Sequence, residues 1–332
     1  MSLIVLFAGL GLLLVLAPDV LLVIFAGLLF GIFFGGGGEW LARRIGVARG
    51  LGVGLFVLLI ILALAGAVLY FAPAAAEQFD RLVEEVPTAI EGLRARLKEY
   101  AWGEELLRLS TPGALMSNVG GGTAAAAVTT TFGAIGNFAI MLIIGLYVAV
   151  DPETYRVGLA NMLAPSARAS GDAVLRKATN TLRSWLVAQL MAMAIVGTLT
   201  WLGLWIVGVP LAPILGLLAA FLAFIPNIGP IIAAAPAVLL ASLDGPMTAA
   251  LVVAVYVAVQ TVESYAITPL IQQERVSLPP VLIISMQLLM GVLFGLLGLA
   301  LATPMAALGL TLVREAYVQR YLAVEERVRT TA

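Results

Sequence analysis

The chain has 332 residues, of which 62% are hydrophobic and only 11% are charged, and its net charge is −1. Soluble domains carry about 25% charged residues, so this composition excludes a soluble globular protein and predicts a membrane protein with the lipid bilayer as its main partner. The lack of cysteine and histidine removes the commonest metal ligands and general bases, and the near-zero net charge offers nothing to nucleic acid, so we expect no cofactor, no metal site, no nucleic-acid partner and no enzymatic activity.

Charge-free runs mark the expected membrane spans, because a spanning helix needs about 20 mostly apolar residues. A short apolar segment, Leu3–Ala17, comes first and has no basic leader region or cleavage site, so we expect it to be retained. Residues 20–38 and 50–76 fit one span each, 109–150 fits one span after a polar start, and 245–262 fits another. The remaining charge-free runs, in the C-terminal half, are too long for single spans.

The charges between the spans predict the orientation. Loop 39–50, segment 151–183 and tail 314–332 each contain more basic than acidic residues, whereas segment 72–118 has eight acids against five bases. Short loops rich in Lys and Arg stay on the cytoplasmic side. We therefore expect an inner-membrane protein with both termini in the cytoplasm and 72–118 outside.

Two segments between the spans are amphipathic. In 77–108, apolar residues repeat at spacings of four and three, which predicts a helical seam that packs either on its own subunit or on a second subunit of a homo-oligomer. In 172–190, an apolar face that ends at Gln189 predicts a helix at the membrane interface that then runs inward. Asp151, directly before Pro152, is expected to cap a helix rather than to form a site.

Glycines at helical spacing indicate close packing between helices. Gly27, Gly31 and Gly35 are four residues apart, as are Gly291 and Gly295. Small residues at this spacing let two helix backbones approach closely, so we expect a packing role. The consecutive glycines 35–38 are predicted to form a loose helix end.

Two long apolar segments cannot cross the membrane as straight helices. Residues 211–243 and 281–313 are 33 residues each, or about 50 Å as helix, against a hydrocarbon core of about 30 Å. Each contains helix breakers near its middle, at Pro226–Pro230 in the first and at Gly295–Gly298 in the second. We predict broken or re-entrant segments, with kinked crossing helices as the alternative.

The predicted fold is an all-α polytopic membrane protein with about eight hydrophobic units. The two broken or re-entrant segments lie in the C-terminal half and form an inverted repeat if both are hairpins. The predicted division is 1–71 for the N-terminal helices, 72–118 for the outer amphipathic segment, 119–150 for a span, 151–183 for a cytoplasmic amphipathic segment, 184–243 and 244–313 for two transport units, and 314–332 for the tail.

Several motifs follow one another in the C-terminal half. They are Gly208-Val209-Pro210, Ile225 to Pro230, Gln260 with Glu263, Leu278-Pro279-Pro280, and Leu293 to Gly298 followed by Thr303-Pro304. With this ordered set, most of 140–312 resembles the autoinducer-2 exporter-like (AI-2E or PerM-type) family of bacterial permeases. The chain departs from the family pattern at three positions, where Asn227 replaces a frequent aromatic residue, Ser264 a frequent Asn and Pro279 a frequent His.

The resemblance implies transport of one of two kinds. Some members of the family export autoinducer-2 or other small polar metabolites, and others exchange sodium or lithium for protons. The departure at Pro279 argues against any coupling that depends on histidine. Membership alone does not decide between the two activities.

Glu263 is the most informative single side chain for either activity. It ends a charge-free run, with Gln260 and Tyr256 at preceding turns of the same face. An acid near membrane depth is costly unless it is paired or functional, so it could bind a cation, a proton or a hydroxylated solute, or else anchor the helix at the interface. Asn227 could contact solute or only turn the chain. The expected solute or ion path comprises Gln189, Pro226, Asn227, Gly229, Pro230, Gln260, Glu263, Gly295, Gly298, Thr303 and Pro304.

Three hypotheses follow for the function. The first is an exporter of a small polar organic solute, which is either facilitative or coupled to an ion gradient. The second is an antiporter that exchanges a monovalent cation for protons, for which Glu263 is the one good carboxylate. The third is a membrane scaffold that does not transport, which explains the seam in 77–108 but not the two matched breaks.

Overall fold

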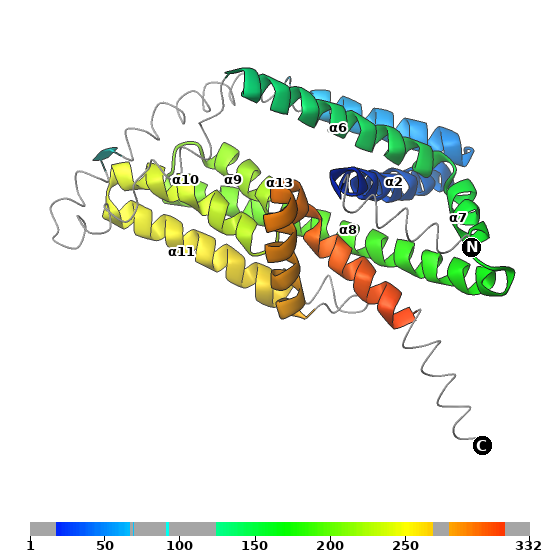
Figure 1. Cartoon of the computed structure of the whole chain (residues 1–332). Coiled ribbons are helices and arrows are strands. Elements are labelled where there is room, and N and C mark those ends of the chain that lie inside the picture. Colours follow the sequence, from blue (N-terminus) through cyan, green and yellow to red (C-terminus); the bar gives the residue numbers. More distant parts are fainter. Residues whose placement is uncertain (1–17, 67–68, 70–90, 93–123, 268–278, 316–332) are drawn as a thin grey trace. The chain divides into compact units, whose positions relative to one another are not determined.

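The computed structural model describes residues 18–66, 69, 91–92, 124–267 and 279–315. All regular structure in these residues is helical, as the composition predicts (Figure 1). The segment Leu3–Ala17 and the seam in 77–108 lie almost entirely outside the described residues, as does most of the C-terminal tail. Those predictions therefore stay predictions.

The described helices include the predicted charge-free runs, and α2 and α8 also extend into the charged segments next to them. A 3₁₀ turn, Pro165–Ala167, precedes the helix that begins at Arg168, and a five-residue π turn, Glu263–Ile267, follows the helix that ends at Val262. The helices are α2 (Pro18–Ile45), an unlabelled helix (Arg49–Gly66), α6 (Ala124–Val150), α7 (Pro152–Asn161), α8 (Arg168–Val207), α9 (Ala212–Leu222), α10 (Ile228–Asp244), α11 (Pro246–Val262) and α13 (Pro280–Leu312).

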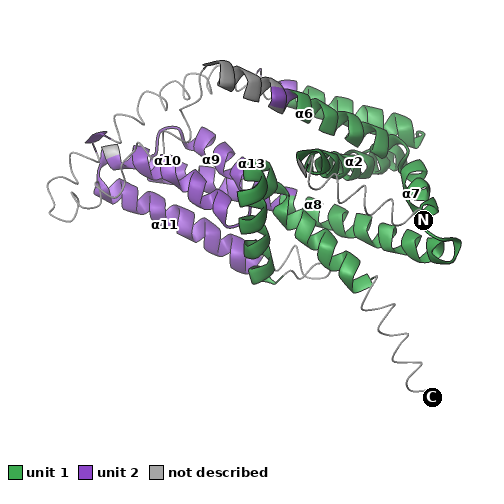
Figure 2. Cartoon of the chain, viewed as in Figure 1, with its two compact units in different colours: residues 1–64, 136–189, 272–332 green, residues 65–135, 190–271 purple. Residues whose placement is uncertain are grey.

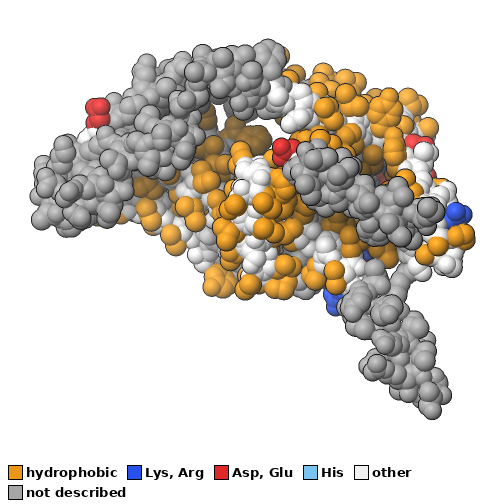
Figure 3. Space-filling model, viewed as in Figure 1, with side chains coloured by type: hydrophobic (Ala, Val, Ile, Leu, Met, Phe, Trp, Pro, Cys, Tyr) orange, Lys and Arg blue, Asp and Glu red, His pale blue; other side chains and the backbone are white. Residues whose placement is uncertain are grey.

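The helices are long and apolar enough for a multi-pass membrane protein. Five described helical stretches could cross a bilayer, and α6 followed by α7 is a sixth candidate with a bend of 90°. Hydrophobic side chains cover most of the described surface on the face shown in Figure 3, and charged ones are sparse there. A water-soluble protein could not expose so much apolar surface. The described residues do not confirm the predicted count of eight units.

The chain divides into two compact units (Figure 2). Unit 1 contains residues 1–64, 136–189 and 272–332, and unit 2 contains residues 65–135 and 190–271. The boundary between Gln189 and Leu190 falls inside α8, which is one continuous helix of 40 residues. The sequence-based boundary at 183 likewise lies within this helix, so the amphipathic segment and the following span share one backbone element.

In unit 1, α2 and α6 run parallel and touch through glycine. A Cβ placed on Gly27 would lie 2.8 Å from the Cβ of Ile144, and one on Gly31 would lie 2.9 Å from the Cβ of Val148. Because both residue numbers rise together, the C-terminal ends of the two helices lie at the same end of the unit. The predicted packing role is confirmed for the glycines of α2, whereas a Cβ on Gly295 would meet no neighbouring atom within 4 Å and Gly295 instead breaks its helix.

The prediction of a loose helix end at Gly35–Gly38 is wrong. These residues are helical, and α2 continues to Ile45. A Cβ on Gly37 would lie 2.1 Å from the ring of Phe56, and one on Gly38 would lie 2.5 Å from the side chain of Val53. The glycines form a flat surface against which the Arg49–Gly66 helix packs, and this tertiary contact outweighs their poor helix propensity.

In unit 2, α9 and α10 form the first helical hairpin. Residues 223–227 join them, and Asn227 has a left-handed φ of 66°. Leu215 and Ala219 of α9 share one buried cluster with Ala233 and Ala237 of α10, so the two helices lie side by side (Figure 1). The first long segment is therefore bent back on itself.

In unit 1, α13 forms the second helical hairpin. Gly295 has φ 60° and ψ −141° and breaks the helix into limbs 280–294 and 296–312. A Cβ on Gly298 would lie 2.1 Å from the carbonyl oxygen of Met290, eight residues earlier. This proximity requires the chain to fold back at Gly295, where Figure 1 shows a sharp bend. The predicted breaks in both long segments are confirmed.

Candidate functional site

Unit 1 buries a set of uncharged polar side chains on α8 and on the α13 hairpin. Thr181 and Gln189 on α8 and Gln287 and Thr303 on α13 are each less than a tenth exposed. No buried Asp, Glu, Lys or Arg accompanies them among the described residues. Amides and hydroxyls can donate and accept hydrogen bonds but supply no net charge.

Three of these side chains lie at one level of the bundle. The hydroxyl oxygens of Thr181 and Thr311 are 3.3 Å apart, and α8 runs in roughly the opposite direction to the limb 296–312 (Figure 1). Gln189 and Thr303 are each eight residues from this contact, or about 12 Å along their helices. Gln189 follows Thr181 and Thr303 precedes Thr311, and the two helices run in opposite directions. Both steps therefore lead the same way along the bundle, so Gln189 and Thr303 lie at the same depth.

The register of the hairpin brings Gln287 to that level as well. Met290 of the first limb shares one buried cluster with Leu301 and Ala302 of the second limb and with Leu182 of α8, and Gln287 lies one turn before Met290. Only 2% of Gln287 is exposed. We call Gln189, Gln287 and Thr303 the neutral polar trio.

The hydroxyl of Thr303 lacks the partner that threonines in these helices normally have. Four described threonines donate to the carbonyl oxygen four residues earlier, as is usual for threonine within a helix. These are Thr179, Thr198, Thr261 and Thr311. Thr303, which is 4% exposed, and Thr200, which is fully buried, have no hydrogen-bond partner at all. A buried hydroxyl without a partner is costly, so Thr303 is available to a bound group.

Pro304 removes a backbone hydrogen-bond donor directly after Thr303. Proline has no N–H to donate to the carbonyl four residues earlier, which here belongs to Ala300. Both Thr303 and Pro304 are buried within α13. The second limb therefore combines, within one turn, the unpartnered Thr303 hydroxyl with a carbonyl that lacks its usual helical donor.

In unit 2, Glu263 and Gln260 form a pair at the end of α11. The Gln260 side-chain amide donates to Oε2 of Glu263 at 3.0 Å, and the Glu263 side chain is partly buried. No ion pair to Glu263 occurs among the described residues. Tyr256 is on the same face, but its hydroxyl donates to the carbonyl oxygen of Ala233 on α10 at 3.1 Å. Tyr256 thus holds α10 and α11 together, and Gln260 is the polar neighbour of the carboxylate.

The remaining predicted site residues lie at the two bends. At the first bend, Asn227 is exposed, Pro226 and Pro230 are partly buried, and Gly229 is buried. At the second bend, Gly295 is exposed and Gly298 is buried against Met290. Gly229 and Gly298 therefore have packing roles, whereas Asn227 and Gly295 present irregular backbone at the surface of their units.

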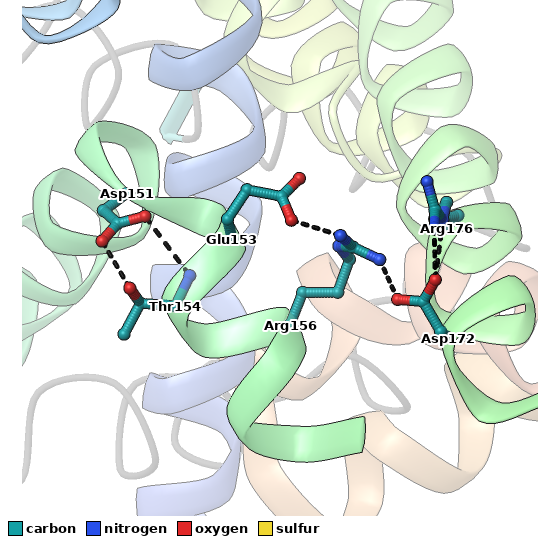
Figure 4. A network of polar contacts seen from close by, with 6 residues as sticks. All are labelled: Asp151, Glu153, Thr154, Arg156, Asp172 and Arg176. Atoms are coloured by element: carbon teal, nitrogen blue, oxygen red, sulfur yellow. Dashed lines mark hydrogen bonds and ion pairs between the residues drawn. The ribbon is translucent and has the colours of Figure 1, made fainter. Parts of the chain in front are cut away.

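A charged network lies at the end of unit 1 where α2 and α6 terminate. The Arg156 guanidinium pairs with Glu153 and Asp172, and Arg176 pairs with Asp172 (Figure 4). These contacts join α7 to the start of α8. In the same part of unit 1, Arg183 of α8 pairs with Glu39 of α2 at 3.6 Å.

The amino-acid sequence was compared with models of known protein families. A family model described as "AI-2E family transporter" matches residues 2–318. The chain belongs to the AI-2E transporter family. The resemblance seen in the C-terminal motifs is thereby confirmed over nearly the whole chain.

Relatives of this AI-2E family member occur in Bacillus subtilis (strain 168). "Putative transport protein YueF" is 31% identical over 184 residues, covering 54% of this chain and 50% of that protein. "Putative transport protein YrrI" is 30% identical over 161 residues, covering 48% and 46%. The chain thus spans about half the length of the curated relatives that it matches.

Sequence reasoning missed three threonines in this family member, of which Thr181 and Thr200 are buried and Thr311 is partly buried. Thr181, Thr200 and Thr311 were not expected to matter, yet Thr181 and Thr311 lie within hydrogen-bond distance of each other and Thr200 has no partner. A usable signal was present for Thr181, which is close to the face formed by Ala178, Leu182 and Trp185. No group of three or more acidic side chains that could hold a metal ion occurs in the described part of the chain.

Asp151 caps α7, as predicted from Pro152. Its carboxylate accepts from the hydroxyl and the backbone N–H of Thr154, and these hydrogen bonds lower the pKa of the Asp151 carboxyl. The cap is therefore present above the pKa of an unfolded Asp and is lost as pH falls through the lowered folded pKa. We expect Asp151→Ala to speed hydrogen exchange at the Thr154 amide several-fold near neutral pH, with no change in the middle of α8. Equal protection in both proteins would contradict the cap.

Proposed function

We propose that this chain carries a small, uncharged polar organic solute across the bacterial inner membrane, as an exporter of an autoinducer-2-like signal or a related metabolite. The observation that supports this most directly is the neutral polar trio beside the α13 hairpin. It supplies amide and hydroxyl groups inside an apolar bundle without a compensating charge. A charged solute would lose its hydration there with no counter-charge to replace it, whereas a neutral hydroxylated solute would exchange hydrogen bonds.

The two helical hairpins support a transport role for this polar set. Irregular backbone at membrane depth is tolerated where protein covers it or where it borders a water-filled cavity. Discontinuous helices in corresponding places are characteristic of transport sites. Asn227 and Gly295, with left-handed φ angles of 66° and 60°, are the points at which each hairpin reverses. Membership of a transporter family is consistent with this proposal.

The orientation with both termini in the cytoplasm is part of the proposal. It is supported by the basic residues at one end of unit 1, where α2 and α6 both terminate. Arg43, Arg44 and Arg49 come from the first loop, and Arg156 and Arg183 from the segment after α6. The positive-inside rule assigns this end to the cytoplasm.

The decisive experiment is solute flux through the purified protein in proteoliposomes. Labelled neutral solutes with several hydroxyl groups are compared with anionic and cationic analogues of the same size, in the presence and absence of sodium and proton gradients. We expect the neutral solutes to cross at least tenfold faster than the charged analogues. A preference for the charged analogues contradicts the neutral site, and absence of all flux favours the scaffold hypothesis.

Glu263 supports a second candidate function, exchange of a monovalent cation for protons. A partly buried carboxylate bonded to an amide can hold a cation or a proton. We expect Glu263→Gln to insert normally but to lower gradient-driven flux at least tenfold, because the amide keeps the shape and removes the charge. Downhill exchange of neutral solute should be affected far less.

The matched control for Glu263→Gln is Asp244→Asn at the exposed end of α10 in the same unit. Asp244→Asn should keep wild-type flux with every gradient. If Glu263→Gln also behaves as wild type, Glu263 has no part in transport. If Glu263→Gln abolishes sodium-for-proton exchange while no organic solute moves in the wild-type protein, the antiporter is the correct function.

A further inference from the structure

The helix α7 lies across the direction of the span that precedes it. The bend between residues 135–150 of α6 and α7 is 90°, and it occurs at Asp151. With 10 residues, or about 15 Å, α7 is too short to cross the hydrocarbon core. A helix perpendicular to a spanning helix at its end lies along the membrane plane.

One side of α7 presents apolar side chains that the rest of the described chain leaves exposed. Tyr155, Leu159 and Met162 are spaced four and three residues apart, so they share one face, and they are 42%, 53% and 55% exposed. At the end of α6, Tyr147 and Val150 are also exposed. The apolar face of α7 therefore continues the lipid-facing surface of the span.

The flank of α7 next to this face is held by the charged network. Arg156 pairs with Glu153 of its own helix and with Asp172 of α8, and Arg176 donates from Nε to Asp172 at 2.9 Å (Figure 4). The two arginines and two carboxylates of the network together have no net charge. Lys177, on the next residue, is exposed and has no carboxylate partner among the described residues. The network thus fixes how α7 is rotated about its axis, with Arg156 towards α8.

The end of unit 1 that carries α7 has a positive charge excess. Residues 39–49 and 151–183 contain eight basic and four acidic side chains. Polybasic segments next to spans are attracted to anionic lipid headgroups. Trp40 on α2, together with Tyr147 and Tyr155, adds exposed aromatic side chains near this end, as is usual at the boundary between lipid tails and water.

We propose that α7 is an interfacial helix that seats its Tyr155, Leu159 and Met162 face in the boundary between headgroups and lipid tails, and that the basic end of unit 1 binds anionic lipid there. The occupant of the apolar face is the bilayer itself. The inference does not depend on which solute is carried. Because the network joins α7 to α8, which also carries Gln189, the lipid anchors the helix that contributes to the neutral polar trio.

The absence of cysteine allows a direct test with single labels. Leu159→Cys and Val157→Cys are each labelled with an environment-sensitive fluorophore in vesicles of phosphatidylcholine and phosphatidylglycerol. Val157 is the matched control, because it is 47% exposed on the same helix but lies on the opposite side. We expect the label at 159 to be blue-shifted and quenched by spin-labelled lipid several-fold more than the label at 157. Equal quenching at the two positions, or an aqueous spectrum at 159, overturns the interfacial helix.

The lipid charge is tested with the same labelled proteins. Quenching at 159 is compared between pure phosphatidylcholine and mixtures that contain phosphatidylglycerol, at low and at high salt. We expect quenching to rise about twofold with the anionic lipid and to lose that increase at high salt, because salt screens the attraction. An increase that is absent, or that survives high salt, overturns the binding of anionic lipid.

Discussion

Gly298→Ala is expected to disrupt the α13 hairpin, whereas Gly309→Ala in the same helix is expected to stabilise it. A methyl group on Gly298 would lie 2.1 Å from the carbonyl oxygen of Met290 and 2.8 Å from the Cβ of Phe294. The obstacle is mainly backbone, which cannot rotate away as a side chain can. We expect a loss of about 3 kcal/mol, at the upper end of overpacking effects. A Cβ on Gly309 would meet no neighbouring atom within 4 Å, so alanine should gain about 0.5–1 kcal/mol.

The two glycine variants are compared by thermal unfolding of the purified protein in detergent. Opposite shifts in Tm would show that the limbs of the hairpin touch at Gly298 and not simply that α13 tolerates substitution poorly. A Gly298→Ala protein as stable as wild type would mean that the limbs do not meet, and α13 would then be a kinked crossing helix.

Thr303→Val is expected to lower solute flux about tenfold without destabilising the protein. Valine has nearly the shape of threonine but no hydroxyl, and the Thr303 hydroxyl has no partner in the folded chain. Removing a buried, unpartnered hydroxyl should raise the free energy of unfolding by about 1 kcal/mol. A loss of flux together with a gain in stability is the result expected when a polar group is kept for a ligand.

Thr200→Val is the matched control for this prediction. Thr200 is fully buried and equally unpartnered, but it lies in unit 2 outside the neutral polar trio. It should also gain stability, while its flux in proteoliposomes stays at the wild-type rate. If both variants lose flux equally, the effect is general to buried threonines. If neither does, Thr303 does not contact the solute.

The two hairpins could be predicted from the sequence because the argument needed only length and helix breakers. Residues 211–243 and 281–313 exceed the thickness of a bilayer as straight helices, and proline or glycine marks the middle of each. The same logic failed at Gly35–Gly38, where four glycines form regular helix. Their neighbour in space, Phe56, comes from a different helix, and sequence spacing along one helix contains no information about that contact.

The candidate site was predicted less completely than the fold. Gln189 and Thr303 were selected from motifs, but nothing in their separation of more than 100 residues indicates that they share a depth. That conclusion needs the Thr181–Thr311 contact and the register of α13. Conversely, the prediction grouped Glu263 with the residues of α13, whereas the structure describes them in different compact units.

The contact between Gly298 and Met290 also limits how the second hairpin can move. Side chains at an interface can change rotamer and let two helices slide, but here backbone meets backbone with almost nothing between. Parting the limbs would leave a void that neither lipid nor neighbouring side chains could readily fill. The hairpin should consequently travel as one rigid body during any cycle of the protein, so its hinges belong at its two ends, next to Pro280 and Leu312.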